Sequence, residues 1–178
     1  MKTLTLLRHA KSSWKDASLQ DCERPLNRRG QRDAPIVAER IKQTGIRPSL
    51  ILSSPAARAW TTAKIVAREI GYPAEFLQQE DRLYHASVRS LVKLIAEQDA
   101  GFNNIMIVGH NPGLTDFANY LSPNLTDNIP TCGFVSFTID LPDWNLDRDI
   151  QTESVIYEYP KRVEKKPDRS RQSGDTLR

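Results

Sequence analysis

The chain has 178 residues, of which 39% are hydrophobic, and this is enough for one domain with a buried core. Its net charge of +3 comes from its end: residues 161–178 hold seven Lys or Arg and three Asp or Glu, whereas residues 1–160 hold 18 basic and 19 acidic side chains. We therefore expect one domain over residues 1–160 with no nucleic-acid partner, followed by a basic, disordered tail over 161–178.

Cysteine usage and hydropathy exclude further classes of protein. The two cysteines, Cys22 and Cys132, form neither a metal-binding spacing nor a disulfide framework. No apolar run is long enough to cross a bilayer, and the N-terminus lacks a signal-peptide pattern. We expect a cytoplasmic monomer with no metal, no cofactor and no membrane partner.

Apolar runs predict strands at 3–7, 49–53 and 104–110. These runs lack a sustained alternation of apolar and polar residues, which is typical of strands covered on both faces. Two later segments, 132–141 and 152–159, predict a hairpin pair at a sheet edge.

Helical patterns lie between the predicted strands. The first helix has Asn27 as a possible N-cap, and Pro35 is expected in an early turn or at a kink. The second covers 55–71, with Pro55 as its first residue and Gly71 past its end. A third helix covers 87–98 and is capped by Ser87. Strands that alternate with helices in this way predict an α/β sandwich.

Charged or imidazole side chains follow the three apolar strands. Arg8 and His9 follow the first, Arg58 lies in the first turn of the helix after the second, and His110 follows the third. Each residue alone has an ordinary explanation, as surface decoration, a solvated helix residue or a buried histidine bonded to backbone. Ligands of open α/β sheets bind outside the carboxyl ends of the strands, so together these side chains predict a cationic pocket for a phosphoryl group.

Three motifs carry a family resemblance: "LLRHA" (6–10), "SSPAARAWTTA" (53–63) and "VGHNPG" (108–113). In this order they resemble the histidine phosphatase superfamily, which includes the phosphoglycerate mutases. The short form, with "RHAKSSW", "RPLNRRG" and "RLYHAS", is most similar to SixA-type phosphohistidine phosphatases. The resemblance covers residues 2–159. It implies a three-layer α/β fold, with a mostly parallel mixed sheet between helices, and metal-independent phosphoryl transfer through a phosphohistidine.

The resemblance also implies roles for single residues. His9 is expected to be the nucleophile, Arg8 and Arg58 to bind the phosphoryl oxygens, and protonated His110 to stabilise their charge. Arg24 is a further candidate contact to substrate. We also expect Asn111 to position a loop, donate to phosphate or cap a helix, with capping favoured.

The proton donor is open among four residues. "RLYHA" places His85 where the wider superfamily has a glutamate; Asp21 is the SixA-like alternative, and Glu80 and Asp81 are further candidates. A weak acid favours leaving groups that protonate readily, such as the nitrogen of phosphohistidine. Only 51 residues separate Arg58 from His110, which leaves little chain for a lid and argues against a mutase. We expect a substrate that is either a phosphohistidine protein or a small phosphorylated metabolite.

Two alternatives come from other classes. Cys22 and Arg28 have the C-x5-R spacing of cysteine-dependent phosphatases, but the preceding residues are polar and Pro25 removes a backbone donor from the loop. The other is a phosphate-binding adaptor without catalysis. In the loop after His9, we expect Lys11, Ser12 and Ser13 to line the pocket mouth and Trp14 to anchor the loop by packing.

Overall fold

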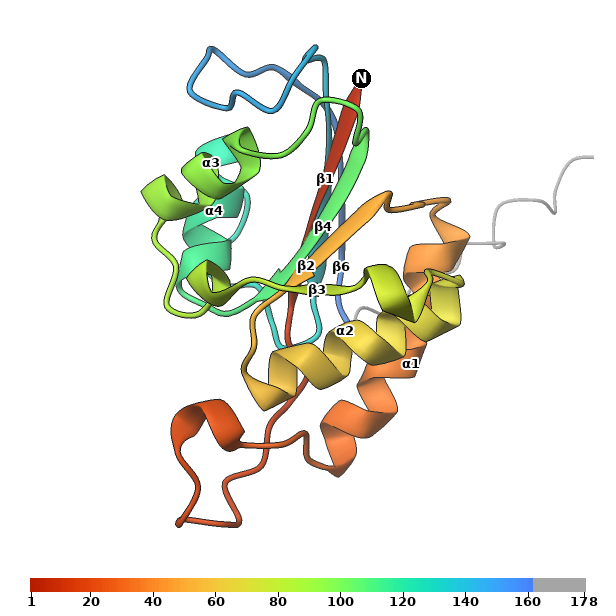
Figure 1. The fold of residues 1–178 in the computed structure, drawn as a ribbon, viewed down its shortest axis with the longest axis vertical. Helices are drawn as coiled ribbons and strands as arrows, with labels where there is room; N and C mark the ends of the chain where they lie inside the picture. The colour runs from red at the N-terminus through yellow and green to blue at the C-terminus, as the bar shows by residue number, and fades with distance from the viewer. Residues whose placement is uncertain (162–178) are drawn as a thin grey trace, which may run out of the picture.

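The computed structural model describes residues 1–161, so the predicted basic tail lies outside the described residues except for Lys161. In that part of the chain, no helix is long and apolar enough to cross a membrane. The architecture is a central sheet with helices on both faces (Figure 1).

The sheet has six strands in the order β3-β2-β4-β1-β5-β6. The first four strands in this order pair in parallel. Strand β5 pairs antiparallel with β1, and β6 pairs antiparallel with β5, so the predicted mostly parallel, mixed sheet is confirmed. The late hairpin pair is also confirmed, with β6 at the edge. The strand bounds are β1 Lys2–Arg8, β2 Leu50–Ser53, β3 Gln78–Gln79, β4 Asn104–Gly109, β5 Phe134–Ile139 and β6 Thr152–Glu158. The short edge strand β3 was not predicted.

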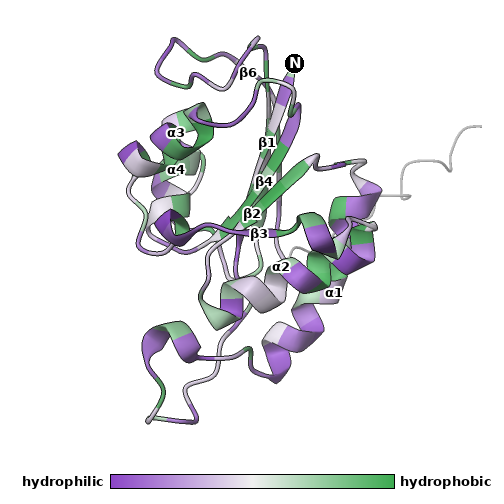
Figure 2. Cartoon of the chain, in the orientation of Figure 1, coloured by the Kyte–Doolittle hydropathy of each residue, from purple (hydrophilic) through white to green (hydrophobic). Residues whose placement is uncertain are grey.

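The described helices cover both faces of the sheet (Figure 1). Helices α1 (Arg28–Gln43) and α2 (Ala57–Ile70) pack on one face, and α3 (Val88–Ala96) and α4 (Gly113–Leu121) on the other. Neighbouring residues of the central strands enter opposite cores: Ile105 and Ile107 pack toward α3 and α4, and Met106 toward α1 and α2. Figure 2 shows these central strands as the most apolar part of the chain. Burial on both faces explains why their sequences lack a sustained alternation.

The predicted helix ends are mostly confirmed. The Asn27 side chain accepts a hydrogen bond from the Gly30 N–H at 2.9 Å, and Gly71 ends α2 in the left-handed conformation with φ of 76°. The prediction that Pro55 is the first residue of its helix was wrong, and of the two alternatives for Pro35 the early turn is excluded, so the kink stays a prediction. Helix α2 begins at Ala57, so Pro55 precedes its N-cap, and Pro35 lies in the interior of α1 rather than in its first turn.

Candidate active site

The carboxyl ends of β1 and β4 bring the two histidines together. These strands are adjacent and parallel, and Arg8 pairs with Gly109 at their ends. A histidine directly follows each strand: His9 after β1 and His110 after β4. The His9 N–H donates to the Gly109 carbonyl at 3.0 Å. The ring centroids of His9 and His110 are 5.1 Å apart. Strand order alone therefore places residues separated by a hundred positions in contact.

A small cavity of about 210 Å³ opens at this edge. It contains six of the predicted site residues: Arg8, His9, Arg24, Arg58, His110 and Asn111. The other lining residues are Lys11, Ser12, Trp14 and Thr131. Thr131 was missed by the sequence analysis, because it lies in a loop before β5 that carries no motif. The four acid candidates do not line the cavity.

His9 is buried and neutral. Its Nδ1 donates to the Ala10 carbonyl at 2.7 Å, which leaves the lone pair on Nε2. Burial, followed by the positive charges of Arg58, Arg8 and Arg24, lowers its pKa to about 4, although the bond to Ala10 acts in the opposite direction. An unprotonated Nε2 is the form of the ring that can attack phosphorus.

His110 forms its hydrogen bond through Nε2, whereas His9 uses Nδ1. Its Nε2 lies 2.8 Å from the Ser54 hydroxyl, whereas Nδ1 is buried without a partner. Burial, then repulsion from His9 once that ring is protonated at low pH, and then the charge of Arg58 lower its pKa to about 3. His110 is therefore neutral in the free protein, because burial among cations disfavours a further positive charge, and its protonation in the transition state stays a prediction.

Arg8, at the end of β1, and Arg58, in the first turn of α2, each have a nitrogen without a hydrogen-bond partner. Arg8 Nη1 donates to the Ile129 carbonyl at 2.8 Å, and both burial and the charge of Arg58 lower the Arg8 pKa. Arg58, 5% exposed, donates to the carbonyl and carboxylate of Asp21 at 2.6 and 2.9 Å. The Nε atoms of both arginines are buried without partners. With His110 Nδ1, they account for three of the five such side-chain atoms in the described part of the chain.

Asp21 joins several elements at the side of the cavity. Its carboxylate accepts from Tyr84 at 2.5 Å, from Arg58 and from Arg24. The Tyr84 hydroxyl, and then the two guanidinium groups, hold the pKa of Asp21 well below its usual range, although partial burial opposes them. The carboxyl group is therefore ionised in this arrangement and carries no proton to donate.

The other acid candidates lie in or beside the short helical turn η3 (Asp81–Leu83). Glu80 caps this turn and forms an ion pair with Arg82 at 2.9 Å. Asp81 and His85 are exposed, and the His85 ring packs against Tyr84 with centroids 4.0 Å apart. The structure thus brings only Asp21 into direct contact with cavity-lining side chains.

Asn111 positions a loop. Its Nδ2 donates to the Asn128 side chain and the Ile129 carbonyl, and its Oδ1 accepts from the Thr115 hydroxyl. The favoured helix-capping role was wrong, since none of these bonds reaches a backbone N–H of α4. Because Arg8 also bonds to the Ile129 carbonyl, Asn111 helps to fix the wall of the cavity.

Two glycines permit close contacts around the site. A Cβ on Gly30 would lie 2.2 Å from the Lys11 carbonyl oxygen, and one on Gly113 would lie 2.4 Å from that of Ala86. The first contact joins α1 to the loop after His9. The second joins α4 to the segment that follows Tyr84 and His85. The glycines in "NRRG" and "HNPG" therefore serve packing.

Cys22 has none of the surroundings of a catalytic thiol. It lies half-buried in the short turn η1 (Asp21–Glu23), not at a strand end, and does not line the cavity. Arg28 begins α1. The C-x5-R spacing is thus a coincidence of sequence, because no strand delivers the cysteine to a cradle of backbone donors.

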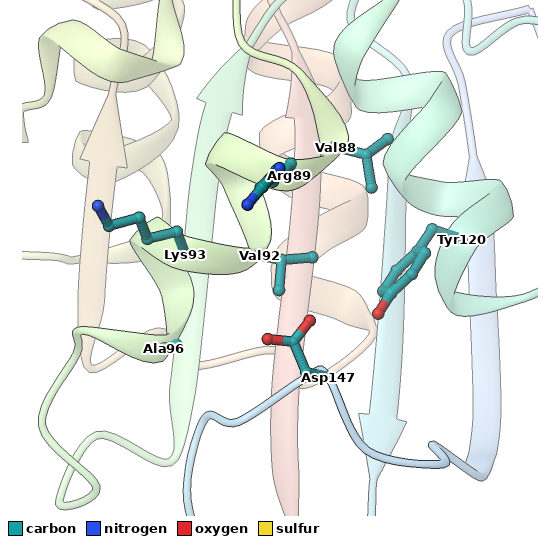
Figure 3. Close-up of a pocket in the computed structure, with 7 residues that line it drawn as sticks. All are labelled: Val88, Arg89, Val92, Lys93, Ala96, Tyr120 and Asp147. Atoms are coloured by element: carbon teal, nitrogen blue, oxygen red, sulfur yellow. The ribbon is translucent and has the colours of Figure 1, made fainter.

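A larger groove of about 690 Å³ lies elsewhere, over α3 (Figure 3). Its floor is aliphatic, with Val88, Val92 and Ala96, and its charges are mixed, with Arg89 and Lys93 opposite Asp147. It contains no histidine or cysteine. The histidines and the buried arginines lie in the smaller cavity, which is therefore the candidate site for phosphoryl transfer.

Comparison with known proteins agrees with this arrangement. A sequence model of the histidine phosphatase superfamily (branch 1) matches residues 4–84. An uncharacterized protein of Picosynechococcus is 32% identical over 122 residues, which is 67% of this chain and 72% of the relative. This chain belongs to the histidine phosphatase superfamily. A chloroplastic, uncharacterized Arabidopsis thaliana protein is 35% identical over 129 residues, and that match spans 68% of this chain but only 59% of the relative.

Solved structures of superfamily members share the fold. The crystal structure of the putative phosphohistidine phosphatase SixA from Agrobacterium tumefaciens is 28% identical, with a TM-score of 0.73 over 87% of this chain and 97% of that chain. A mycobacterial glucosyl-3-phosphoglycerate phosphatase is 15% identical, with a TM-score of 0.64 over 86% and 98%. Within the superfamily the chain thus has the short, SixA-like form.

Proposed function

We propose that this protein is a phosphatase that acts through a covalent phosphohistidine on His9. The observation that carries the proposal is the set of partnerless buried nitrogens on Arg8, Arg58 and His110, which belong to residues lining the same cavity as the neutral nucleophile. Buried donors without partners are costly. A phosphoryl group supplies acceptor oxygens and negative charge to all three.

The reaction proceeds in two displacements. The lone pair on His9 Nε2 attacks phosphorus, the bond to the leaving group breaks, and the leaving atom keeps that electron pair and takes up a proton. Water then attacks phosphorus, the N–P bond breaks, and a proton from the water is released with phosphate formation. Neutral His9 is regenerated. Each step replaces one bond to phosphorus by another.

The surrounding cations stabilise the transferring group. Arg8 and Arg58 bind its oxygens, and the anion raises the proton affinity of His110 when it arrives, because it offsets the nearby positive charges. Arg24 adds a further cation at the wall. Fixed positive charge of this kind performs the role that Mg²⁺ has in other phosphoryl-transfer enzymes, so activity is expected to persist in a chelator.

A phosphohistidine protein is the substrate that this chemistry favours. An ionised Asp21 is a poor proton donor, and the imidazole nitrogen of phosphohistidine protonates more readily than an alkoxide leaving group. The similarity to SixA supports the same substrate class. Small phosphorylated metabolites are the second candidate, and the glucosyl-3-phosphoglycerate phosphatase supports them only through a shared fold.

The test is turnover of a phosphohistidine protein, a panel of sugar phosphates and an aryl phosphate, all with chelator present. We expect the phosphohistidine protein to be the best substrate and His9→Ala to lower kcat by about 10³-fold or more. Labelled phosphoenzyme should be acid-labile and base-stable in the wild type and absent from His9→Ala.

Cys22→Ser is the matched control and should retain full activity. Loss of activity in Cys22→Ser alone, or strong inhibition by the chelator, would contradict the mechanism. A wild type that forms no labelled enzyme and turns over no donor would instead be a phosphate-binding module.

A further inference from the structure

Trp14 lies at the mouth of the catalytic cavity and is exposed to solvent. Its side chain lines the cavity with His9 and Arg58, yet 74% of the residue is accessible. Trp14 therefore packs as a loop anchor through one face only, and most of its surface remains open to solvent. A single exposed aromatic residue is common on protein surfaces. This one differs because it borders a reactive site and rests on a buried cation.

The indole ring stacks on Arg24. The guanidinium carbon lies 3.6 Å from the ring centroid, well within the range of a cation–π contact. Arg24 is only 8% exposed, and it donates to the Ser12 hydroxyl at 2.8 Å and to the Asp21 carboxylate at 3.0 and 3.2 Å. One face of the ring is thus supported by a cation with fixed partners.

The backbone around Trp14 is fixed as well. Ser12 forms an antiparallel bridge with Leu26, and the Ser13 N–H donates to the Pro25 carbonyl at 2.8 Å. The loop extends beyond the carboxyl ends of the strands (Figure 1). A ring supported on one side and positioned by two chain segments loses little further freedom on binding, which favours contact with a ligand.

We propose that Trp14 is a specificity-determining residue that stacks on a flat leaving group, such as the imidazole of phosphohistidine, while the phosphoryl group lies at His9. The proposal rests on the proposed function, because it concerns the leaving group of the same substrate whose phosphoryl group is transferred to His9. Flat rings prefer offset or edge contacts with indole, and a protonated imidazole gains a cation–π contact. Substrates without a ring gain neither.

The simpler alternative is that Trp14 only restrains Arg24. Both roles predict lower activity in Trp14→Ala, but they differ in which substrates are affected. A restraint on Arg24 acts on the phosphoryl site and changes every substrate equally. A stacking surface changes only substrates with a ring.

The kinetic test compares wild type, Trp14→Phe, Trp14→Leu and Trp14→Ala on four donors. Phosphohistidine and phenyl phosphate carry rings; phosphoramidate and glycerol phosphate do not. For Trp14→Ala and Trp14→Leu we expect kcat/KM to fall about three- to tenfold on the ring donors. We expect less than a twofold change on the others, and Trp14→Phe should keep most of the ring preference. Equal losses on all four donors, or no loss on any, would overturn the proposal.

A binding test separates this proposal from the catalytic one. Phenylphosphonate and methylphosphonate are not hydrolysed, so their dissociation constants can be measured by calorimetry whether or not the protein turns over a donor. Wild type should prefer the phenyl compound, and Trp14→Ala should lower that preference about three- to tenfold. An unchanged preference refutes the role of Trp14, whereas an active His9→Ala variant refutes only the proposed nucleophile.

Discussion

His9 and His110 are neighbours with different hydrogen-bond partners. His9 is oriented by the carbonyl of the next residue, and His110 by the Ser54 hydroxyl that arrives with β2. A hydroxyl that donates to His110 Nε2 leaves the ring proton on Nδ1, which is the partnerless nitrogen. Ser54 thus orients the donor that we propose contacts the phosphoryl group, without contacting it.

Ser54→Ala should lower kcat by up to about tenfold with little change in KM, because the His110 ring loses the one bond that sets its orientation. Steady-state kinetics on a phosphohistidine protein would measure this. Ser53→Ala is the matched control, since the adjacent buried hydroxyl bonds to backbone and not to His110. Equal losses in both variants would show a general packing defect instead.

Tyr84 is the largest influence on the pKa of Asp21. In Tyr84→Phe, the carboxylate loses its 2.5 Å hydrogen bond while both arginine contacts remain. We expect the pKa of Asp21 to rise, because the charged form is less stabilised. Carboxyl NMR titration would show the shift, with Asp16 as the control carboxyl, since its partner is Ser18. An unchanged Asp21 titration would disprove the assignment.

Among the elements, the contact between α1 and the loop after β1 sets the shape of the cavity. The N–H of Asn27 donates to the Lys11 carbonyl at 3.0 Å, and the first turn of α1 packs on the same oxygen through Gly30. Lys11 lines the cavity. Helix α1 therefore contributes to the site through backbone packing, although none of its side chains lines the cavity.

Gly30→Ala should destabilise the protein by about 1–3 kcal/mol, because the new Cβ would displace the Lys11 backbone. The direction of the change in the free energy of unfolding is informative, since Gly→Ala inside an unhindered helix is stabilising. We also expect a lower kcat/KM as the loop moves. Urea unfolding and kinetics would test both effects, with the exposed Gln31→Ala as control. A Gly30→Ala protein as stable as the control would contradict the contact.

For the whole molecule, the buried histidines make stability depend on pH. The pKa values of His9 and His110 in the folded protein, about 4 and about 3, lie below the usual 6.5. The unfolded chain therefore binds more protons below pH 6.5, so both groups favour the folded state above that pH and lose this contribution as the pH falls toward 4.

We expect the free energy of unfolding to decrease between pH 7 and pH 4.5, with His9 contributing about 2 kcal/mol of the change. Urea denaturation across this range would show it, and His9→Gln should have a shallower dependence on pH. The third histidine, His85, is exposed, so His85→Gln is the control and should follow the wild type. A pH dependence that is the same in all three proteins would rule out this origin.

The sequence by itself determined the layers of the fold and the central part of the site. Doubly covered strands and capped helices have local patterns, and parallel strands bring their carboxyl ends to one edge, so Arg8, His9, Arg58 and His110 could be placed together before any coordinates were known.

Only the tertiary structure decided the ionisation of His110, the bonds of Asn111, the position of Thr131 and the exposure of Trp14. It also showed that Asp21 is ionised beside two arginines. These properties depend on burial and on contacts between segments far apart in the chain, such as Asp21 with Tyr84 and Asn111 with Ile129. Desolvation and long-range hydrogen bonds have no local pattern, and for that reason the proton donor could not be assigned from the motif that suggested it.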